Sequence, residues 1–280
     1  MKTIPIVLAS DNNYAPYMYV TMASVLENAK EDTFYDFYLL VPAAFSKVNL
    51  RHFKDLSRQY PRCKVNFIDM KNTFESTQMT IGHITSPTYY RLLLGTLLPQ
   101  YDRVIYLDGD IAVMGDLGEL YAMPLEDAYI AGVKAPGYVT WNEDFKQDYC
   151  RRSGLPAIKD YVNAGVLLIN LKNIRRDKLE PLFLDLVDKQ LPSQDQDILN
   201  RICFGHIKQL PFKYNVMTKR AFESDAYLTR VFPLSEIEEA RQRPVIIHYA
   251  DKIKPWHDKN VIWGDKWWHY AKSVSYTHLR

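Results

Sequence analysis

Short apolar runs alternate with segments of helical periodicity along the first half of the chain. The apolar runs are rich in β-branched and aromatic residues, which is typical of buried strands. Strands are predicted over Ile4–Ala9, Phe37–Val41, Lys64–Ile68 and Arg103–Leu107. Helices are predicted over Tyr17–Ala29, after an N-cap at Ser46, and over Tyr89–Leu98, where Pro99 ends the pattern. We expect the helix after Ser46 to turn Val48, Leu50, Phe53, Leu56 and Tyr60 inward.

Further strands are predicted over Tyr129–Val133, Gly165–Leu171 and Val245–Tyr249. Strands that alternate with helices indicate an α/β fold with a mostly parallel sheet and helices on both faces. No repeat or linker-like change of composition divides the chain. We therefore expect one main domain over residues 1–250, in which the region from about residue 190 forms a subdomain or lid.

The composition limits the classes of protein. Hydrophobic residues make up 47% of the 280 residues, as in an ordinary globular protein, and 35 basic residues nearly balance 33 acidic ones. The near balance argues against a dedicated nucleic-acid binder. Apolar runs are too short for a membrane span or a signal-peptide core. Cys63, Cys150 and Cys203 are odd in number and scattered, so the sequence predicts a cytoplasmic protein without a disulfide framework.

Candidate chemistry lies where the predicted strands end, because open α/β sheets bind ligands at the carboxyl ends of their strands. No G-x-G-x-x-G or P-loop motif is present. Asp108-Gly109-Asp110 instead follows the apolar run that ends at Leu107. Carboxylates two residues apart on an extended segment point to the same side, and such a pair suits a divalent cation. A surface Asp-Gly turn is the alternative interpretation.

His248 closes another apolar run, and Lys254 follows it. An imidazole beside two carboxylates favours Mn²⁺ over Mg²⁺, although Mg²⁺ remains the alternative. Lys254 is suited to neutralising a phosphate. Structural roles remain open for both residues. They also remain open for Arg91, which is a candidate charge partner of Asp108, and for Gln194–Asp197, which are suited to opening a helix with Ser193 or Asp195 as its cap.

The ordered set of motifs resembles glycosyltransferase family 8. The motifs are Ala9-Ser10-Asp11-Asn12-Asn13-Tyr14, Thr88-Tyr89-Tyr90-Arg91, Tyr106-Leu107-Asp108-Gly109-Asp110, Asn163 through Leu171, Asp195-Gln196-Asp197, and His248-Tyr249 with Lys254-Pro255-Trp256. The resemblance runs from about Ile4 to Trp268. It implies a GT-A fold, which is a Rossmann-like nucleotide-sugar-binding fold, and a retaining, metal-dependent transfer of glucose or galactose from a UDP-sugar to a saccharide or lipid-linked saccharide.

The resemblance also assigns roles to individual residues. Asp108, Asp110 and His248 are implied to ligate Mn²⁺, and Lys254 to contact the diphosphate. The uridine is implied to contact Ala9, Asp11, Asn13 and Tyr14, with Gly109 beside the donor. The donor sugar is implied to face Arg91, Asn163, Gly165, Asp195 and Gln196. The resemblance places the region from about residue 190 on the acceptor side. It also implies that residues 251–280 close the donor site.

Gln196 and Asp195 are the candidate catalytic residues. The resemblance places the amide of Gln196, which is a poor nucleophile, at the position that faces the sugar, with Asp195 beside it. We therefore expect a front-face substitution in which both residues stabilise positive charge on the sugar, rather than two displacements through a covalent intermediate.

Two features depart from the family pattern. Many relatives carry glycine where this chain has Asp251, so a carboxylate is expected near the diphosphate. The segment 251–280 is basic and aromatic, and Trp263, Trp267, Tyr270 and Val274 share one helical face. That face is suited either to a bilayer, at the cytoplasmic side of the inner membrane, or to packing on the domain.

Three other functions remain open. A metal-dependent nucleotidyltransferase also uses paired aspartates, but it is expected to carry a glycine-rich, basic loop where this chain has Asp11-Asn12-Asn13-Tyr14. A non-catalytic UDP-sugar-binding protein would bind the donor without releasing UDP. A glycogenin-like protein would attach glucose to itself.

Overall fold

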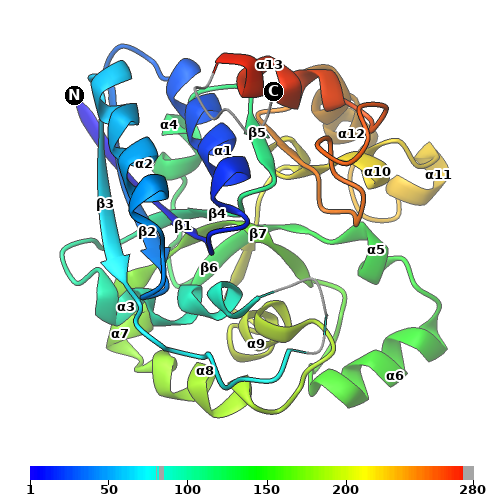
Figure 1. Ribbon diagram of the computed structural model, residues 1–280. Coiled ribbons are helices and arrows are strands. Elements are labelled where there is room, and N and C mark those ends of the chain that lie inside the picture. The colour runs from blue at the N-terminus through cyan, green and yellow to red at the C-terminus, as the bar shows by residue number, and fades with distance from the viewer. Residues whose placement is uncertain (80, 82–84, 274–280) are drawn as a thin grey trace.

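A seven-stranded sheet organises the computed structural model, which describes residues 1–79, 81 and 85–273 (Figure 1). The strand order is β3 (Cys63–Asp69), β2 (Thr33–Val41), β1 (Lys2–Ala9), β4 (Val104–Leu107), β7 (Val162–Ile169), β6 (Ile130–Lys134) and β8 (Ile207–Gln209). The first four strands are parallel, β7 is antiparallel to both β4 and β6, and β8 is parallel to β6. The prediction of a mostly parallel, mixed sheet is confirmed.

The sheet separates two apolar layers. Ile105 and Leu107 of β4 pack into one cluster, and Val104 and Tyr106 pack into the other. The two clusters alternate along β4 because successive side chains of a strand point to opposite faces of the sheet. The first cluster includes residues of α1 (Ala15–Glu27) and α2 (Lys47–Gln59), and the second includes residues of α8 (Leu179–Val187) and α9 (Gln194–Ile202). Helices therefore cover both faces, as predicted.

A second, three-stranded sheet lies at the carboxyl end of β4, which is a strand of the first sheet. Its order is β5 (Ile111–Val113), β10 (Ile246–His248) and β9 (Val216–Met217). The expected strand at Val245–Tyr249 exists but belongs to this sheet rather than to the main one. In β10, His248 lies opposite Ile111 of β5, so the end of β10 is held beside the turn that follows β4.

The remaining elements are short. They are η1 (Ser86–Leu93), α3 (Leu94–Leu97), α4 (Gly118–Ala122), α5 (Pro136–Val139), α6 (Glu143–Ser153), α7 (Leu171–Arg176), η2 (Phe212–Tyr214), α10 (Thr218–Ala221), α11 (Asp225–Leu228), α12 (Leu234–Gln242) and α13 (Gly264–Ser273).

Three local expectations need correction. Ser46 caps α2 as predicted, because its side chain accepts from the backbone N–H of Asn49. Val48, however, is 56% exposed rather than turned inward. It lies about 100° around the helix from Asn49, and Asn49 faces the interior together with Phe53. The segment expected as one helix at Tyr89–Leu98 is divided between the 3₁₀ helix η1, which ends at Leu93, and the short α-helix α3 over Leu94–Leu97. The strand expected to end at Leu171 ends at Ile169, because the side chain of Asn170 caps α7.

The C-terminal aromatic face packs on the domain. Trp267 and Tyr270 of α13 are buried, and both belong to the apolar cluster that includes α1 and β5. Trp256 stacks on Tyr17 of α1 with ring centroids 3.8 Å apart. Of the two roles expected for this face, packing is therefore the one observed for its described residues. Val274 and the rest of 274–280 lie outside the described residues.

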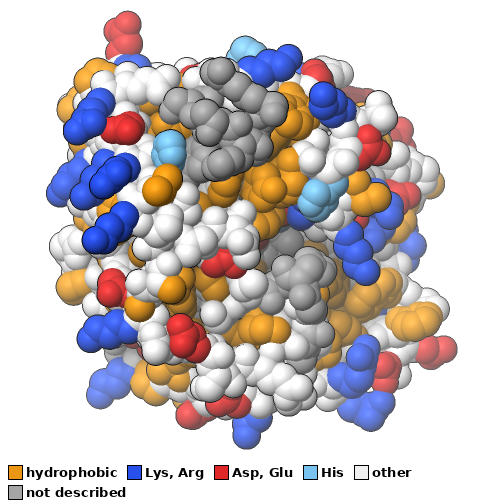
Figure 2. Space-filling view, in the orientation of Figure 1, with side chains coloured by type: hydrophobic (Ala, Val, Ile, Leu, Met, Phe, Trp, Pro, Cys, Tyr) orange, Lys and Arg blue, Asp and Glu red, His pale blue; other side chains and the backbone are white. Residues whose placement is uncertain are grey.

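Charge is dispersed over the visible surface. Figure 2 shows Lys and Arg side chains mainly around the rim of this face, interspersed with acidic ones, while apolar side chains lie nearer the middle. Among the residues that the structure describes, no helix is both long enough and apolar enough to cross a bilayer.

Candidate active site

Asp108, Asp110 and His248 converge at one edge of the main sheet. The two aspartates occupy the short turn between β4 and β5, and His248 ends β10. One ligand atom from each of the three side chains lies within 4.8 Å of the other two. The two sheets meet at this turn, so residues 140 positions apart in the sequence share one site.

The donor set fits a divalent transition metal. Two carboxylates and one imidazole offer oxygen and nitrogen ligands, and Mn²⁺ accepts both. His248 Nε2 lies 3.3 Å from Asp110 Oδ1. The side chains of His248 and Asp110 are 3% and 10% exposed, whereas that of Asp108 is 30% exposed. The cluster therefore opens on the side of Asp108, where further ligands from a bound molecule have access.

Lys254 contacts the same cluster. Its ammonium donates to Asp110 Oδ2 and to the carbonyl oxygen of Tyr249, both at 2.6 Å. Burial opposes the charged form of Asp110, but the charge of Lys254, together with the neighbouring His248 ring, outweighs burial and holds its pKa below the usual carboxyl range. Asp110 is thus ionised at neutral pH, which is the form that metal binding would require.

Gly165 leaves room for the side chains of His248 and Asp108, because it carries no Cβ atom. Because β7 is antiparallel to β4, the amino end of β7 reaches the site edge, and Asp108 N–H donates to Gly165 O at 2.8 Å. A Cβ atom on Gly165 would lie 2.3 Å from His248 Cε1 and 2.8 Å from Asp108 Oδ2. Both are closer than any normal contact, so only glycine fits between these two side chains.

Gly165→Ala is therefore expected to displace His248 and Asp108 together. We expect Mn²⁺ affinity, measured by electron paramagnetic resonance titration, to fall at least about 10- to 100-fold, which is the loss typical of disturbed metal ligation. Stability should fall by about 1–3 kcal/mol from overpacking. The control is Gly115→Ala, because a Cβ there meets only Val245 at an ordinary 3.8 Å. Unchanged Mn²⁺ affinity in Gly165→Ala would contradict the assignment of these ligands.

Arg91 joins Asp108 to Asp195. The guanidinium is buried, donates to Asp108 Oδ1 at 2.8 Å, and lies 3.0 Å from Asp195 Oδ2. Burial opposes its charge, but the two aspartates overcome this effect and raise the pKa of Arg91. The expected pairing of Arg91 with Asp108 is confirmed.

Asp195 has a different environment from a first-turn residue of a solvated helix. Its side chain is 6% exposed, and its carboxylate accepts from the Thr88 hydroxyl at 2.6 Å in addition to its pairing with Arg91. Burial raises its pKa despite these partners. Ser193 lies at the N-cap of α9, but its side chain makes no capping bond and instead contacts the hydroxyls of Tyr138 and Tyr149. The helix therefore opens where the structural interpretation places it, with Asp195 and Asp197 in its first turn, but neither Ser193 nor Asp195 caps it through a side-chain bond.

Gln196 lies beside Asn163 at the same edge. Its Oε1 accepts from Asn163 Nδ2 at 3.1 Å and from the backbone N–H of Ala164 at 3.0 Å. Its Nε2 donates to the Tyr161 hydroxyl at 3.0 Å. Both ends of the amide are therefore held by the protein.

The first loop adjoins the cluster through Tyr14. A Cβ on Gly109 would lie 3.0 Å from Tyr14 Cδ1, so the Tyr14 ring lies directly against this glycine. Asp11 Oδ1 accepts from the backbone N–H groups of Asn13 and Tyr14, and Asp11 Oδ2 accepts from Thr85. Ala9 ends β1, and Asn13 is exposed. The loop is thus preorganised by Asp11 at the carboxyl end of β1.

Asn215 is a site residue that the sequence did not reveal. It is fully buried between η2 and β9, and its side chain contacts both His248 and Asn163. It stands in an aromatic and apolar stretch, Phe212 to Met217, without a motif around it. The pairing of β9 with β10 brings it beside His248.

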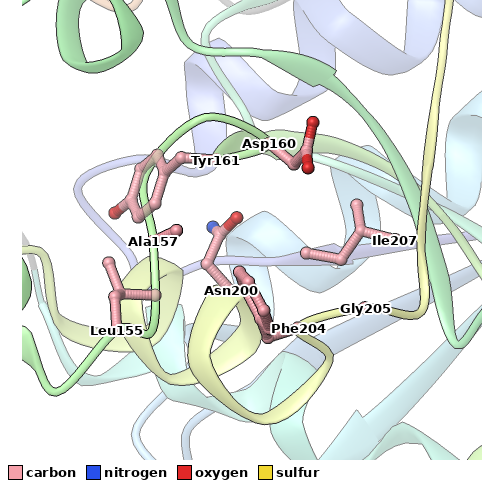
Figure 3. Close-up of a pocket in the computed structure, with 8 residues that line it drawn as sticks. All are labelled: Leu155, Ala157, Asp160, Tyr161, Asn200, Phe204, Gly205 and Ile207. Carbon is pink, nitrogen blue, oxygen red and sulfur yellow. The ribbon is translucent and has the colours of Figure 1, made fainter.

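A separate pocket lies beyond Tyr161 (Figure 3). It has a volume of about 100 Å³ and is lined by Leu155, Ala157, Asp160, Tyr161, Asn200, Phe204, Gly205 and Ile207. Pockets that bind small molecules usually measure about 300–1,000 Å³. None of its lining residues belongs to the carboxylate–imidazole cluster. The pocket is therefore too small for a nucleotide sugar and does not mark the candidate site.

Comparisons with known proteins agree on one family. Residues 5–260 match the model of "Glycosyl transferase family 8". The chain is 30% identical over 287 residues to a lipopolysaccharide 1,2-glucosyltransferase of Escherichia coli, covering 96% of this chain and 75% of that protein. It is 27% identical over 241 residues to a lipopolysaccharide 1,3-galactosyltransferase of Salmonella typhimurium, covering 82% and 67%. The structure of a galactosyltransferase, LgtC, in complex with donor and acceptor sugar analogues superposes with a TM-score of 0.79 at 28% identity, covering 97% of this chain and 96% of that one. The α/β fold is therefore GT-A.

Proposed function

The chain belongs to glycosyltransferase family 8, and from this premise we propose that it transfers a hexose from a UDP-sugar to a saccharide acceptor with retention of configuration. The hexose is glucose or galactose, and the reaction depends on Mn²⁺, with Mg²⁺ as an alternative. The similar lipopolysaccharide glucosyl- and galactosyltransferases support an acceptor in a cell-surface polysaccharide or a lipid-linked saccharide. The protein would then act on the cytoplasmic side of the inner membrane.

One observation carries the proposal, namely the carboxylate–imidazole cluster with Lys254 on its edge. Departure of the sugar leaves negative charge on the diphosphate of UDP. A divalent metal bound by Asp108, Asp110 and His248 would supply a Lewis acid at this place. Lys254 adds a fixed positive charge that is already oriented by Asp110 and the Tyr249 carbonyl, so it does not have to be reorganised during the reaction.

The nucleoside would lie over the first loop. The loop follows β1 at the edge where doubly wound sheets bind nucleotides. Tyr14 presents an aromatic ring beside Gly109 and the cluster, and Asp11 is fixed by two backbone N–H groups. We assign the uridine to Ala9, Asp11, Asn13 and Tyr14, and the ribose–diphosphate end to the cluster.

The sugar-facing residues favour a front-face route. Gln196 Oε1 already accepts two hydrogen bonds, which lowers its nucleophilicity, and the Asp195 carboxylate is paired with Arg91 and Thr88. Their oxygen atoms remain suited to stabilising a developing oxocarbenium ion by charge and dipole. Mass-spectrometric trapping of a glycosyl group on Asp195 would overturn this part of the proposal.

The test of the proposed function is UDP release from UDP-glucose and from UDP-galactose, each with Mn²⁺ and then with a chelator. Slow hydrolysis of the donor does not require the acceptor, so release is expected from one donor and is expected to stop on chelation. The same incubation, followed by the intact mass of the protein, distinguishes self-glucosylation from transfer to another acceptor. Binding of either donor without any release would instead indicate a non-catalytic UDP-sugar-binding protein.

Asp251→Gly is expected to keep or improve donor affinity. Asp251 lies in the sequence midway between His248 and Lys254. We therefore expect its carboxylate near the place assigned to the diphosphate, where a negative charge is unfavourable unless it is turned away. Glycine would retain the backbone N–H and remove the charge. The dissociation constant of UDP with Mn²⁺, measured by calorimetry, checks this expectation, and a large loss of affinity would show that Asp251 has a binding role of its own.

A further inference from the structure

Asn215 lies between His248, which is a candidate metal ligand, and Asn163, which is one of the residues assigned to the donor sugar. Its side chain is fully buried. Asn215 Oδ1 is 2.9 Å from His248 Nδ1, and Asn215 Nδ2 donates to Asn163 Oδ1 at 2.8 Å. The residue therefore has a partner at each end of its amide and no access to water.

The neighbouring backbone settles which end of each amide is oxygen. The backbone N–H of Gly165 donates to the Asn163 side chain at 3.0 Å, so the receiving atom must be Oδ1. The atom of Asn215 that faces this oxygen must be a donor, which makes it Nδ2. The other end, which faces His248 Nδ1, is consequently the oxygen of Asn215.

This orientation assigns the proton of a neutral His248. Both ring nitrogens face an oxygen, but within the described part of the chain only Nδ1 makes a hydrogen bond, at 2.9 Å to Asn215 Oδ1, whereas Nε2 makes a longer 3.3 Å contact with Asp110 Oδ1. The single hydrogen of a neutral ring is therefore assigned to Nδ1, and Nε2 presents its lone pair. That lone pair faces Asp110 Oδ1 at 3.3 Å. A lone pair and a carboxylate oxygen repel each other at this separation. A cation bound between them would attract both atoms and outweigh that repulsion.

The same chain of bonds continues to Gln196. Asn163 Nδ2 donates to Gln196 Oε1, which also accepts from the backbone N–H of Ala164. The backbone again fixes the oxygen end, so Gln196 Nε2 faces the hydroxyl of Tyr161. That hydroxyl donates to the buried Asp197 at 2.6 Å, which completes a set of bonds with one consistent direction.

We propose that Asn215 is a positioning residue that fixes His248 in the Nδ1-protonated form, directs Nε2 toward Asp108 and Asp110, and links this ligand through Asn163 to Gln196. Outer hydrogen bonds of this kind orient metal-binding imidazoles and raise their basicity. The part that concerns metal affinity rests on the proposed function. The protonation site of His248 does not, because it is a property of the metal-free protein.

The first test is the protonation site of His248 in metal-free protein. Long-range ¹H–¹⁵N correlation spectra of ¹⁵N-histidine-labelled protein at pH 9, where an imidazole is ordinarily neutral, report which ring nitrogen carries the hydrogen. The His248 signals are those missing in His248→Gln, which separates them from the other histidines. We expect Nδ1–H in the wild type. A wild-type His248 with its hydrogen on Nε2 would overturn the proposal, whatever the variants do.

The second test compares two substitutions of Asn215. Asn215→Ala removes the acceptor, so the preference for Nδ1–H should be lost and Mn²⁺ affinity, measured by electron paramagnetic resonance, should fall about 10- to 100-fold. Asn215→Asp keeps an acceptor beside Nδ1 and should recover the Nδ1–H form, but its second oxygen faces Asn163 Oδ1, so Mn²⁺ affinity should recover only in part. Equal loss in both variants, or no loss in Asn215→Ala, would contradict the positioning role.

Asn173→Ala is the matched control. Asn173 is also buried, and its amide donates to the backbone carbonyls of Glu126 and Ala128, away from the cluster. Its loss should lower stability without changing the protonation site of His248 or Mn²⁺ affinity. A wild-type protein that binds no Mn²⁺ would contradict the proposed function, whereas the wild-type spectrum would still decide the role of Asn215.

Discussion

Asp110→Asn is expected to lower kcat/KM for the UDP-sugar about a thousandfold. A metal ion contributes several kcal/mol to the stabilisation of developing negative charge, and each 1.4 kcal/mol corresponds to a factor of ten in rate. The substitution keeps the shape of the side chain but removes the charge that pairs with Lys254 and faces His248 Nε2. Initial rates of UDP release over a range of donor and Mn²⁺ concentrations measure the effect.

The matched control for Asp110→Asn is Asp55→Asn. Asp55 pairs with Arg58 on the exposed surface of α2, so its neutralisation should leave the rate unchanged. Circular dichroism establishes that both variants are folded. If Asp110→Asn retained kcat/KM within about tenfold of the wild type, Asp110 would not be an essential ligand.

Arg91→Met is expected to lower the free energy of unfolding at neutral pH by about 3–5 kcal/mol. Arg91 is the cationic partner of Asp195, and both side chains are almost completely buried. Removing one member of such a pair leaves an uncompensated buried charge, which is far more costly than the loss of a surface pair. Urea denaturation measures the change. Arg58→Met, which breaks an exposed pair with Asp55, should cost no more than about 1 kcal/mol.

The loss of unfolding free energy caused by Arg91→Met should become smaller as the pH falls. Burial raises the pKa of Asp195 in the folded wild type, and removal of Arg91 should raise it further. The folded state then binds more protons than the unfolded state between the ordinary carboxyl pKa of about 3.9 and the raised value, so stability increases as the pH falls through that window. A loss that stays constant from pH 7 to about pH 4 would show that the ionised Asp195 is not its source.

The sequence pattern was sufficient for the strands of the central sheet except β8 (Ile207–Gln209), which was not predicted, and for the place of the first aspartates. Buried strands read as continuous apolar runs, and Asp108 and Asp110 follow directly after one of them. The Asn163–Gly165 segment precedes its strand instead of following it. It reaches the same edge because β7 is antiparallel to β4, a direction that no local pattern of β7 encodes.

Other features depend on contacts between distant residues. The strand ending in His248 had the right pattern, but its membership of a second sheet is decided by pairing with β5, which is only three residues long. The capping interpretation of Asp195 failed because Arg91, distant in sequence, draws the carboxylate into the interior. Asn215 has no sequence signal, because its role lies in the direction of two hydrogen bonds.

The aromatic C-terminal face shows the same limit. Its helical spacing predicts an apolar face but does not say what covers it. In the structure the cover is the domain itself, since Trp267 is fully buried and Trp256 stacks on Tyr17. The tryptophans over residues 251–273 are therefore explained by the packing of this segment on the domain.

The central claim is that Asp108, Asp110 and His248 hold a divalent metal through which UDP binds. Calorimetric titration of UDP into the protein, once with Mn²⁺ and once after treatment with a chelator, tests it most directly. We predict binding with Mn²⁺ and a loss of measurable heat after chelation, with recovery when Mn²⁺ is restored. Equal affinity for UDP in the presence and absence of metal would contradict the claim and would move the nucleotide away from this cluster.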